Sequence, residues 1–235
     1  ASFLGGRVNQ APPVLTPLAD HTVLEDAPLS IQIPTNTFVD QDATDALAYS
    51  AGLADGTALP TWLTFNSVTH TFGGTPANSE VGTLNLAVTA TDSGGLSATS
   101  SFTLTVQNVN DAPTMTMPLT DQSVTQGSLF TFMVPADSVA DVDAGDTLAY
   151  SATRADGTTL PTWLTFNPST RTFSGTPQGP DIGTLDVRVT ATDTGALSAG
   201  DVFTLTILPI TGTEGNDTRI GTGGDDVIQG LAGDD

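Results

Sequence analysis

Aspartates recur in this chain at spacings that suit a hard metal ion. Two D-x-D pairs occur, each followed by a third aspartate: Asp40, Asp42 and Asp45, then Asp141, Asp143 and Asp146. Two T-A-T-D segments end in Asp92 and Asp193, and V-N-D-A-P supplies Asn110 and Asp111. Calcium accepts about six to eight oxygen ligands in irregular geometry, whereas magnesium requires a tight octahedron. These residue types therefore predict calcium binding, provided that the fold brings the separate segments together.

The overall charge agrees with an acidic, cation-binding surface. The 235 residues include 26 acidic and 5 basic side chains, a net charge of -21, and no cysteine. Such a field repels nucleic acid and anionic membranes, so neither is an expected partner, and disulfides and thiolate metal sites are excluded. No apolar run approaches the ~20 residues of a membrane span, so direct membrane insertion is not expected. An acidic surface that only confers solubility remains the alternative to cation-binding loops.

The segments that must position these aspartates occur twice, at a constant offset of 101 residues. This offset separates Trp62 from Trp163, and it separates Asp92 from Asp193. A unit of ~100 residues is the size of one β-sandwich domain. We therefore divide the chain into an N-terminal tail (1–8), two domains (9–109 and 110–210) and a C-terminal tail (211–235).

Both units are predicted to be all-β. In T-L-N-L-A-V-T-A-T-D and F-T-L-T-V, apolar residues alternate with polar ones, which is typical of half-buried strands. Segments such as A-D-G-T, G-G-T-P and D-S-G-G are interpreted as turns, in which Asp55 and Asp156 are plain turn residues. About seven short strands per unit predict a Greek-key β-sandwich, whose connecting loops cluster at two poles. Carboxylates at one pole would repel one another unless a cation lay among them; the alternative is that they only cap turns.

The repeated segments also resemble a known family. L-P-T-W-L-T-F-N, T-F-S-G-T-P, G-T-L-D-V-R-V-T-A-T-D and F-T-L-T-I are similar to the dystroglycan-type cadherin-like domain, also called a putative Ig domain of bacterial surface proteins. The resemblance covers both units and implies tandem cadherin/Ig-like sandwiches with calcium at their junction. The ligands that it implies there are Asn110, Asp111, Asp141, Asp143 and Asp193. Glu25, in V-L-E-D-A-P-L, matches the glutamate that a cadherin domain supplies from its far pole.

The chain departs from the cadherin pattern at several positions. Asn9 and Gln10 stand where the second unit has an Asn–Asp pair, so a weaker calcium site is expected in the first unit. The ligands of that weaker site would be Asp40, Asp42 and Asp92. Gln126 replaces Glu25 in the second unit, and N-S-V-T-H-T-F offers no counterpart to the cadherin Asp-Arg-Glu element. We therefore expect fewer ions per junction than in a cadherin.

The C-terminal tail carries a nine-residue repeat of glycine and aspartate, with Asp217, Asp226 and Asp235 in register. It resembles the RTX nonapeptide of calcium-binding β-rolls, in which glycine permits tight turns and aspartate binds the ion. About three stacked copies are needed for stability. The tail is thus predicted to be an incomplete β-roll, largely disordered here, or alternatively a flexible linker. The resemblance implies a fragment of a secreted, RTX-type bacterial adhesin.

No motif indicates catalysis, and the two histidines, His21 and His70, have no histidine counterpart in the second unit. We expect a non-enzymatic, calcium-rigidified adhesion or extender module on the bacterial cell surface, with other domains of the same chain as neighbours. The alternative is a calcium-dependent module that binds polysaccharide or a second copy. Trp62 and Trp163 bear on this choice: they are either exposed platforms for sugars or, if Leu59–Leu63 forms one helical turn, core residues.

Overall fold

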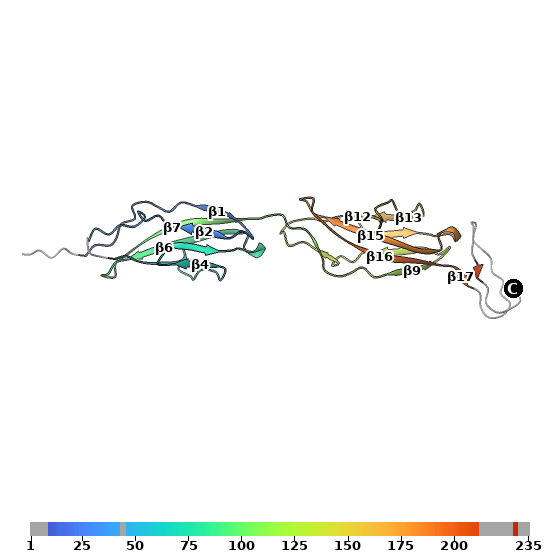
Figure 1. The fold of residues 1–235 in the computed structure, drawn as a ribbon, viewed down its shortest axis with the longest axis horizontal. Coiled ribbons are helices and arrows are strands. Elements are labelled where there is room, and N and C mark those ends of the chain that lie inside the picture. Colours follow the sequence, from blue (N-terminus) through green and yellow to red (C-terminus); the bar gives the residue numbers. More distant parts are fainter. Residues whose placement is uncertain (1–8, 43–45, 212–227, 230–235) are drawn as a thin grey trace, which may run out of the picture. The chain divides into compact units, whose positions relative to one another are not determined.

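Strands are almost the only regular secondary structure in the described residues. This computed structural model describes residues 9–42, 46–211 and 228–229 (Figure 1). The chain divides into two compact units, Ala1–Val109 and Asn110–Asp235. The all-β prediction is confirmed, and the only departures among the described residues are two single-turn 3-10 helices, Asn78–Glu80 and Gly179–Asp181.

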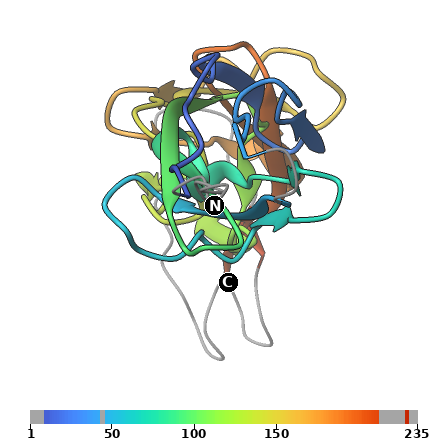
Figure 2. The same cartoon turned by 90° about the vertical axis from the view of Figure 1, so that its left-hand side faces the viewer.

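The first unit is a sandwich of two sheets, with strand orders β1-β7-β6-β3 and β2-β5-β4. The strands are His21–Leu24 (β1), Leu29–Gln32 (β2), Ala48–Leu53 (β3), Leu63–Asn66 (β4), Thr71–Gly74 (β5), Gly82–Thr91 (β6) and Ser97–Gln107 (β7). Strand β1 runs parallel to β7, and the other pairs are antiparallel. Figure 2 views this unit nearly along its strands, so the loops that join them face the viewer.

The second unit repeats this topology, with strand orders β12-β15-β16-β9 and β10-β14-β13. The strands are Gln122–Thr125 (β9), Phe130–Met133 (β10), Ala149–Arg154 (β12), Leu164–Asn167 (β13), Thr172–Gly175 (β14), Gly183–Thr192 (β15) and Ser198–Leu208 (β16). A short ladder joins Thr114–Met115 (β8) to Val139–Ala140 (β11), where the first unit has a single bridge between Val14 and Phe38. Ile210–Thr211 (β17) pairs in parallel with Ile228–Gln229 (β18).

Each sandwich buries its own apolar core. Phe72, Leu86 and Leu104 are fully buried in the first unit, and Phe173 and Phe203 are fully buried in the second. These side chains come from strands of both sheets, and the phenylalanine rings contact one another edge to face. The alternating pattern in the sequence therefore identifies the inward face of the strands correctly.

The L-P-T-W segments form tight turns that are closed by a single i→i+3 hydrogen bond. The N–H of Leu63 donates to the carbonyl of Pro60 at 3.0 Å, and Leu164 donates likewise to Pro161. Pro60 favours this turn because its ring fixes φ. The indole rings of Trp62 and Trp163 are half-buried, and each packs against the core of its own unit. They are therefore neither fully exposed platforms nor fully buried core residues.

The G-G-T-P segment is not a turn, contrary to the prediction, and the equivalent S-G-T-P segment of the second unit is not a turn either. Gly73 and Gly74 are the last residues of β5, and Gly175 is the last residue of β14. A Cβ atom on Gly74 would overlap the carbonyl oxygen of Trp62, and one on Gly175 would overlap that of Trp163. Glycine is needed there because the tryptophan turn lies directly against the strand.

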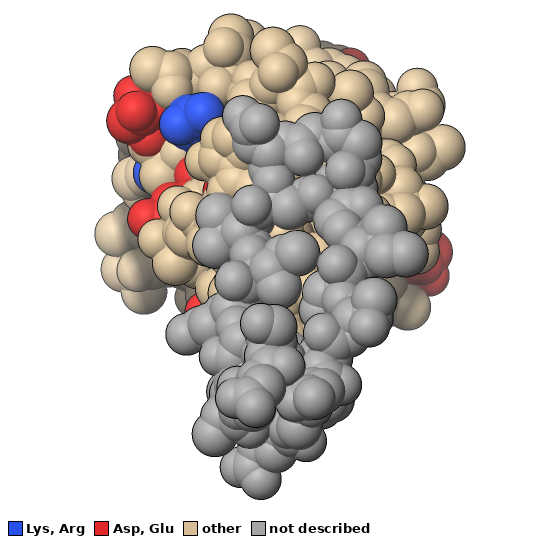
Figure 3. Space-filling view, turned by 90° about the vertical axis from the view of Figure 1, so that its right-hand side faces the viewer, with Lys and Arg blue, Asp and Glu red and all other residues tan. Residues whose placement is uncertain are grey.

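Charged side chains are sparse on the face shown in Figure 3. The described surface there is mainly uncharged, with a few separate acidic and basic groups that form no continuous patch. Among the described residues, no helix combines the length and apolar character that crossing a membrane would need.

Candidate metal site

Three segments of the second unit meet at one pole: the start of the unit, the loop between β11 and β12, and the loop after β15. Asn110 and Asp111 precede β8, and Asp141 follows β11. Asp143 lies in the loop before β12, and Asp193 follows β15. The predicted convergence of these five residues requires contacts between loops that are far apart in the chain, and the hydrogen bonds supply them.

Two hydrogen bonds tie the start of the unit to the aspartate loops. The side-chain amide of Asn110 donates to Oδ2 of Asp193 at 3.0 Å. The backbone N–H of Asp111 donates to Oδ2 of Asp143 at 2.7 Å. Asp143 and Asp193 are both buried, at 6 % exposure each. The five predicted ligands thus form one connected group within this unit.

Gly195 lets the Asn110 side chain approach Asp193. A Cβ atom at Gly195 would overlap the amide of Asn110, and Gly94 stands in the same relation to Asn9 in the first unit. The glycine of the T-A-T-D-x-G segment therefore has a packing role at the site. The sequence does hold a sign of this role, because Gly94 and Gly195 are separated by the same 101 residues as Asn9 and Asn110.

Three aspartates of the second unit form a carboxylate cluster. Asp141, Asp143 and Asp146 each offer an oxygen, and these oxygens lie within 4.8 Å of one another. In the sequence, Asp146 is simply the third aspartate after the D-x-D pair of Asp141 and Asp143. Its place in the cluster depends on Thr194, whose hydroxyl donates to Oδ1 of Asp146 at 2.7 Å.

Turn capping accounts for only part of these carboxylates. Oδ1 of Asp141 accepts the N–H of Asp143 at 3.0 Å, as a turn-capping aspartate would. Oδ2 of Asp141 and Oδ2 of Asp146 are buried and have no hydrogen-bond partner among the described residues. A buried carboxylate oxygen without a partner is costly unless a cation or water compensates it. The donor set consists of hard oxygens only, so it fits calcium.

The described part of the first unit has a similar framework, with Gln10 in place of Asp111, while Asp45, the counterpart of Asp146, lies outside the described residues. Asn9 donates to Oδ2 of Asp92 at 3.1 Å, and the N–H of Gln10 donates to Oδ2 of Asp42 at 2.9 Å. Oδ1 of Asp40 accepts the N–H of Asp42, and its Oδ2 is buried without a partner in the described part of the chain. Gln10 thus preserves the backbone contact that Asp111 makes, but not its carboxylate. The weaker site expected here stays a prediction.

Glu25 is buried in the first unit, with 1 % of its surface exposed. Its Oε1 accepts the backbone N–H of Val109 at 2.6 Å, and its Oε2 is buried without a partner in the residues described. Val109 immediately precedes Asn110 in the chain. Gln126, which occupies the equivalent position in the second unit, is similarly buried at 2 % exposure.

The remaining aspartates singled out in the sequence lie in the C-terminal tail and in the two A-D-G-T turns. Asp217, Asp226 and Asp235 lie outside the described residues. Asp55 and Asp156 are turn residues, as interpreted: Oδ1 of Asp55 accepts the N–H and hydroxyl of Thr57, and Oδ1 of Asp156 accepts those of Thr158. These hydrogen bonds lower the pKa of both carboxyl groups below its ordinary value.

The family of the chain follows from its sequence. Residues 12–107 and 112–208 match the family described as Putative Ig domain, one copy in each unit. The chain belongs to this family. These Ig domains are also 31% identical, over 137 residues, to the Serine-rich adhesin for platelets of Staphylococcus aureus strain MRSA252. That match covers 58% of this chain but only 9% of the adhesin.

Solved structures support the same fold. The Ig domains match Drosophila N-cadherin EC1-4 with a TM-score of 0.58 and 16% identity, over 85% of this chain and 50% of that one. They match human CDH23 EC21-23 with a TM-score of 0.58 and 19% identity, over 91% and 77%. At such identities the likeness establishes a cadherin/Ig-like sandwich fold and nothing about ligands.

Proposed function

We propose that this chain is a calcium-binding adhesion or extender module of a bacterial cell-surface protein. One observation carries the proposal: within a cluster of three carboxylates, Asp141 and Asp146 each hold a buried oxygen that has no hydrogen-bond partner in the described part of the chain. Calcium would be held there by Asp141, Asp143 and Asp146, with Asn110, Asp111 and Asp193 completing the oxygen-rich shell. The bound ion would neutralise the converging charges and fix the loops that carry them.

The adhesive role draws on the relatives. The S. aureus protein is named as an adhesin for platelets, and it is far longer than this chain. We therefore place this chain as one part of a longer surface protein whose other domains are its neighbours. A binding or spacer role, rather than catalysis, agrees with this family.

Glu25 is proposed as a further calcium ligand. Its carboxylate is fixed to the N–H of Val109, one peptide bond before Asn110. Its second oxygen is buried without a partner in the described residues. A calcium ion bound at this oxygen would compensate its buried negative charge.

The C-terminal tail is proposed to begin an RTX-type β-roll. Strands β17 and β18 pair in parallel, with Ile210 opposite Ile228, so paired residues are 18 positions apart. This separation equals two nine-residue repeats, which is the spacing expected if two repeats make one turn of a roll. Asp217 and Asp226 lie between the paired strands in sequence and would be its calcium ligands.

Calorimetric titration with calcium tests the proposed site. The wild-type protein should bind calcium, and the double variant Asp141→Asn/Asp146→Asn should lose the tightest binding event. Glu25→Gln should weaken calcium binding because it removes a carboxylate, and it should fold normally because glutamine is already buried at the equivalent Gln126. Asp156→Asn is the matched control and should titrate like the wild type. Identical titrations of the double variant and the wild type would contradict the proposal.

Calcium-dependent binding of polysaccharide or of a second copy is the second candidate function. A hollow beside Trp163 favours the polysaccharide, since an aromatic ring next to polar side chains suits a sugar.

A further inference from the structure

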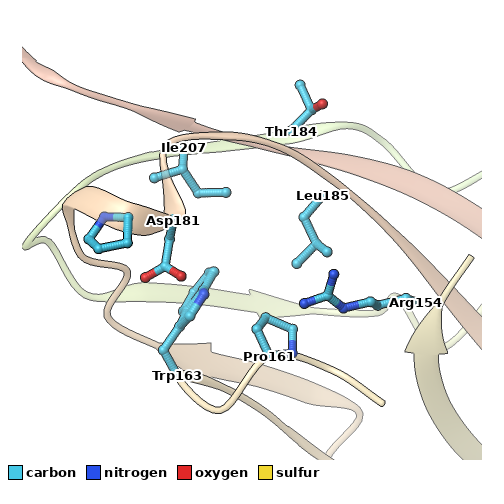
Figure 4. Close-up of a pocket in the computed structure, with 8 residues that line it drawn as sticks. Arg154, Pro161, Trp163, Asp181, Thr184, Leu185 and Ile207 are labelled. Atoms are coloured by element: carbon cyan, nitrogen blue, oxygen red, sulfur yellow. The ribbon is translucent and has the colours of Figure 1, made fainter. Parts of the chain in front are cut away.

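A small hollow lies beside Trp163 in the second unit (Figure 4). Its volume is about 190 Å³, and its lining consists of Arg154, Pro161, Trp163, Pro180, Asp181, Thr184, Leu185 and Ile207. Figure 4 shows the carboxylate of Asp181 beside the indole ring, and the guanidinium of Arg154 across the hollow near Pro161 and Leu185. Pro180 and Thr184 are exposed, so the hollow is open to solvent.

The polar groups of this hollow are held in place by the protein. The Nε–H of Arg154 donates to the carbonyl of Thr159 at 3.2 Å, which leaves its terminal N–H groups as donors for a ligand. Oδ2 of Asp181 accepts the N–H of Gln178 at 2.8 Å, within the capping box of the Gly179–Asp181 turn. The edge of the Trp163 ring is fixed against Gly175, where a Cβ atom would come within 2.9 Å of Cε3. The site thus offers a rigid ring, a fixed donor and a fixed acceptor.

A second hollow continues the first along the same surface. It has a volume of about 230 Å³ and shares Arg154, Thr184 and Leu185 with the first. Its other lining residues are Ala155, Asp156 and Asp186. Arg154 therefore lies between two adjoining hollows, each of which also has an acidic side chain. Together they form a groove that we call the Arg154 groove.

The first unit does not carry the same groups at the matching positions. Leu53 stands where the second unit has Arg154, and Ser79 stands where it has Pro180. Trp62 and Glu80 match Trp163 and Asp181. Asn85 also stands where the second unit has Asp186, so Arg154 and Asp186 are the two charges of the groove that the first unit lacks. Arg154 is one of only 5 basic residues in the chain.

We infer that the Arg154 groove binds a neutral disaccharide unit of a polysaccharide, an inference that rests on the second candidate function above. One pyranose ring would lie on Trp163, with its hydroxyls accepting from Arg154 and donating to Asp181. The next ring would occupy the hollow beside Asp156 and Asp186. An acidic sugar suits the groove less, because these three aspartates would repel its carboxylate.

Tryptophan fluorescence provides a test on the full chain. In a Trp62→Phe background, Trp163 is the sole tryptophan, and its emission is followed on titration with cellobiose, maltose and lactose. At least one should produce a saturable change with a dissociation constant on the order of 1 mM. Adding Arg154→Leu, which copies the first unit, should weaken binding about tenfold through loss of a charged hydrogen bond. The free monosaccharides should bind more weakly than the disaccharide.

Controls separate this inference from others. A Trp163→Phe variant reports on Trp62 and should show no saturable change with the same sugars. Calorimetry on the wild type should give the same affinity as fluorescence, which guards against an effect of the Trp62→Phe change. The inference is overturned if no disaccharide binds, if Arg154→Leu leaves binding unchanged, or if D-glucuronic acid binds more tightly than the neutral sugars. None of the residues of the Arg154 groove is a proposed calcium ligand. Failure of the sugar-binding inference would therefore not count against the proposed calcium site.

Discussion

Saturating calcium should raise the free energy of unfolding of the second unit by roughly 2.7 kcal/mol when the free ion exceeds its dissociation constant about a hundredfold. The double variant Asp141→Asn/Asp146→Asn should lose this gain. Without calcium, the same variant should be more stable than the wild type, by on the order of 1 kcal/mol, because it removes repulsion between closely spaced, half-buried carboxylates. The double variant should therefore be less stable than the wild type when calcium is bound and more stable than the wild type when calcium is absent.

Chemical denaturation with and without a calcium chelator measures this reversal. A Trp62→Phe background restricts the fluorescence signal to Trp163 and hence to the second unit. Asparagine keeps the Oδ1 acceptor that Asp141 offers to the N–H of Asp143, so the turn itself is preserved. Asp156→Asn, at an exposed turn, serves as the control and should respond to calcium like the wild type. If the double variant is destabilised equally in both conditions, the aspartates stabilise only the turns.

Replacing Gly74 with alanine should destabilise the first unit by about 1–3 kcal/mol. The new Cβ atom would overlap the backbone carbonyl of Trp62, so either β5 or the tryptophan turn must shift. The φ angle of Gly74 is not in the left-handed region, so the loss would come from crowding alone. Urea denaturation in a Trp163→Phe background, followed by Trp62 fluorescence, measures the change.

Gly73→Ala is the matched control for Gly74→Ala. Its nearest neighbour would be the carbonyl oxygen of Leu29 at 3.9 Å, an ordinary contact, and the second unit already carries Ser174 at this position. Gly73→Ala should therefore be neutral or slightly stabilising, since alanine restricts the unfolded chain. Equal losses in the two variants would indicate that the tryptophan turn does not constrain the strand.

The strand pattern and the repeat could be predicted because they depend on local alternation and on a constant offset. Leu86 and Leu104 lie on the buried face that their alternation indicates. The role of Gly74 could not be predicted, because G-G-T-P has the composition of a turn. What fixes this glycine is a carbonyl from another turn, and only the folded chain brings the two together.

The same limit applies to side chains whose partners lie in distant loops. Asp146 enters the carboxylate cluster through Thr194, which is 48 residues away. His70 had no histidine counterpart, but its position is repeated: His70 stacks on Tyr49, and Arg171 lies over Tyr150. Both residues have positive φ, at 52° and 54°, so the backbone conformation is shared while the side chain differs. The sequence did distinguish the surface around Arg154 from that of the first unit, because a charged residue stands there where the first unit has Leu53.

A crystal structure of the protein grown with calcium tests the central claim most directly, by anomalous scattering at the pole of the second unit. We predict an anomalous peak about 2.3–2.6 Å from carboxylate oxygens of Asp141 and Asp146, including the two that now lack a partner. Water molecules hydrogen-bonded to those oxygens, with no anomalous signal at saturating calcium, would contradict the assignment of this pole as a calcium site.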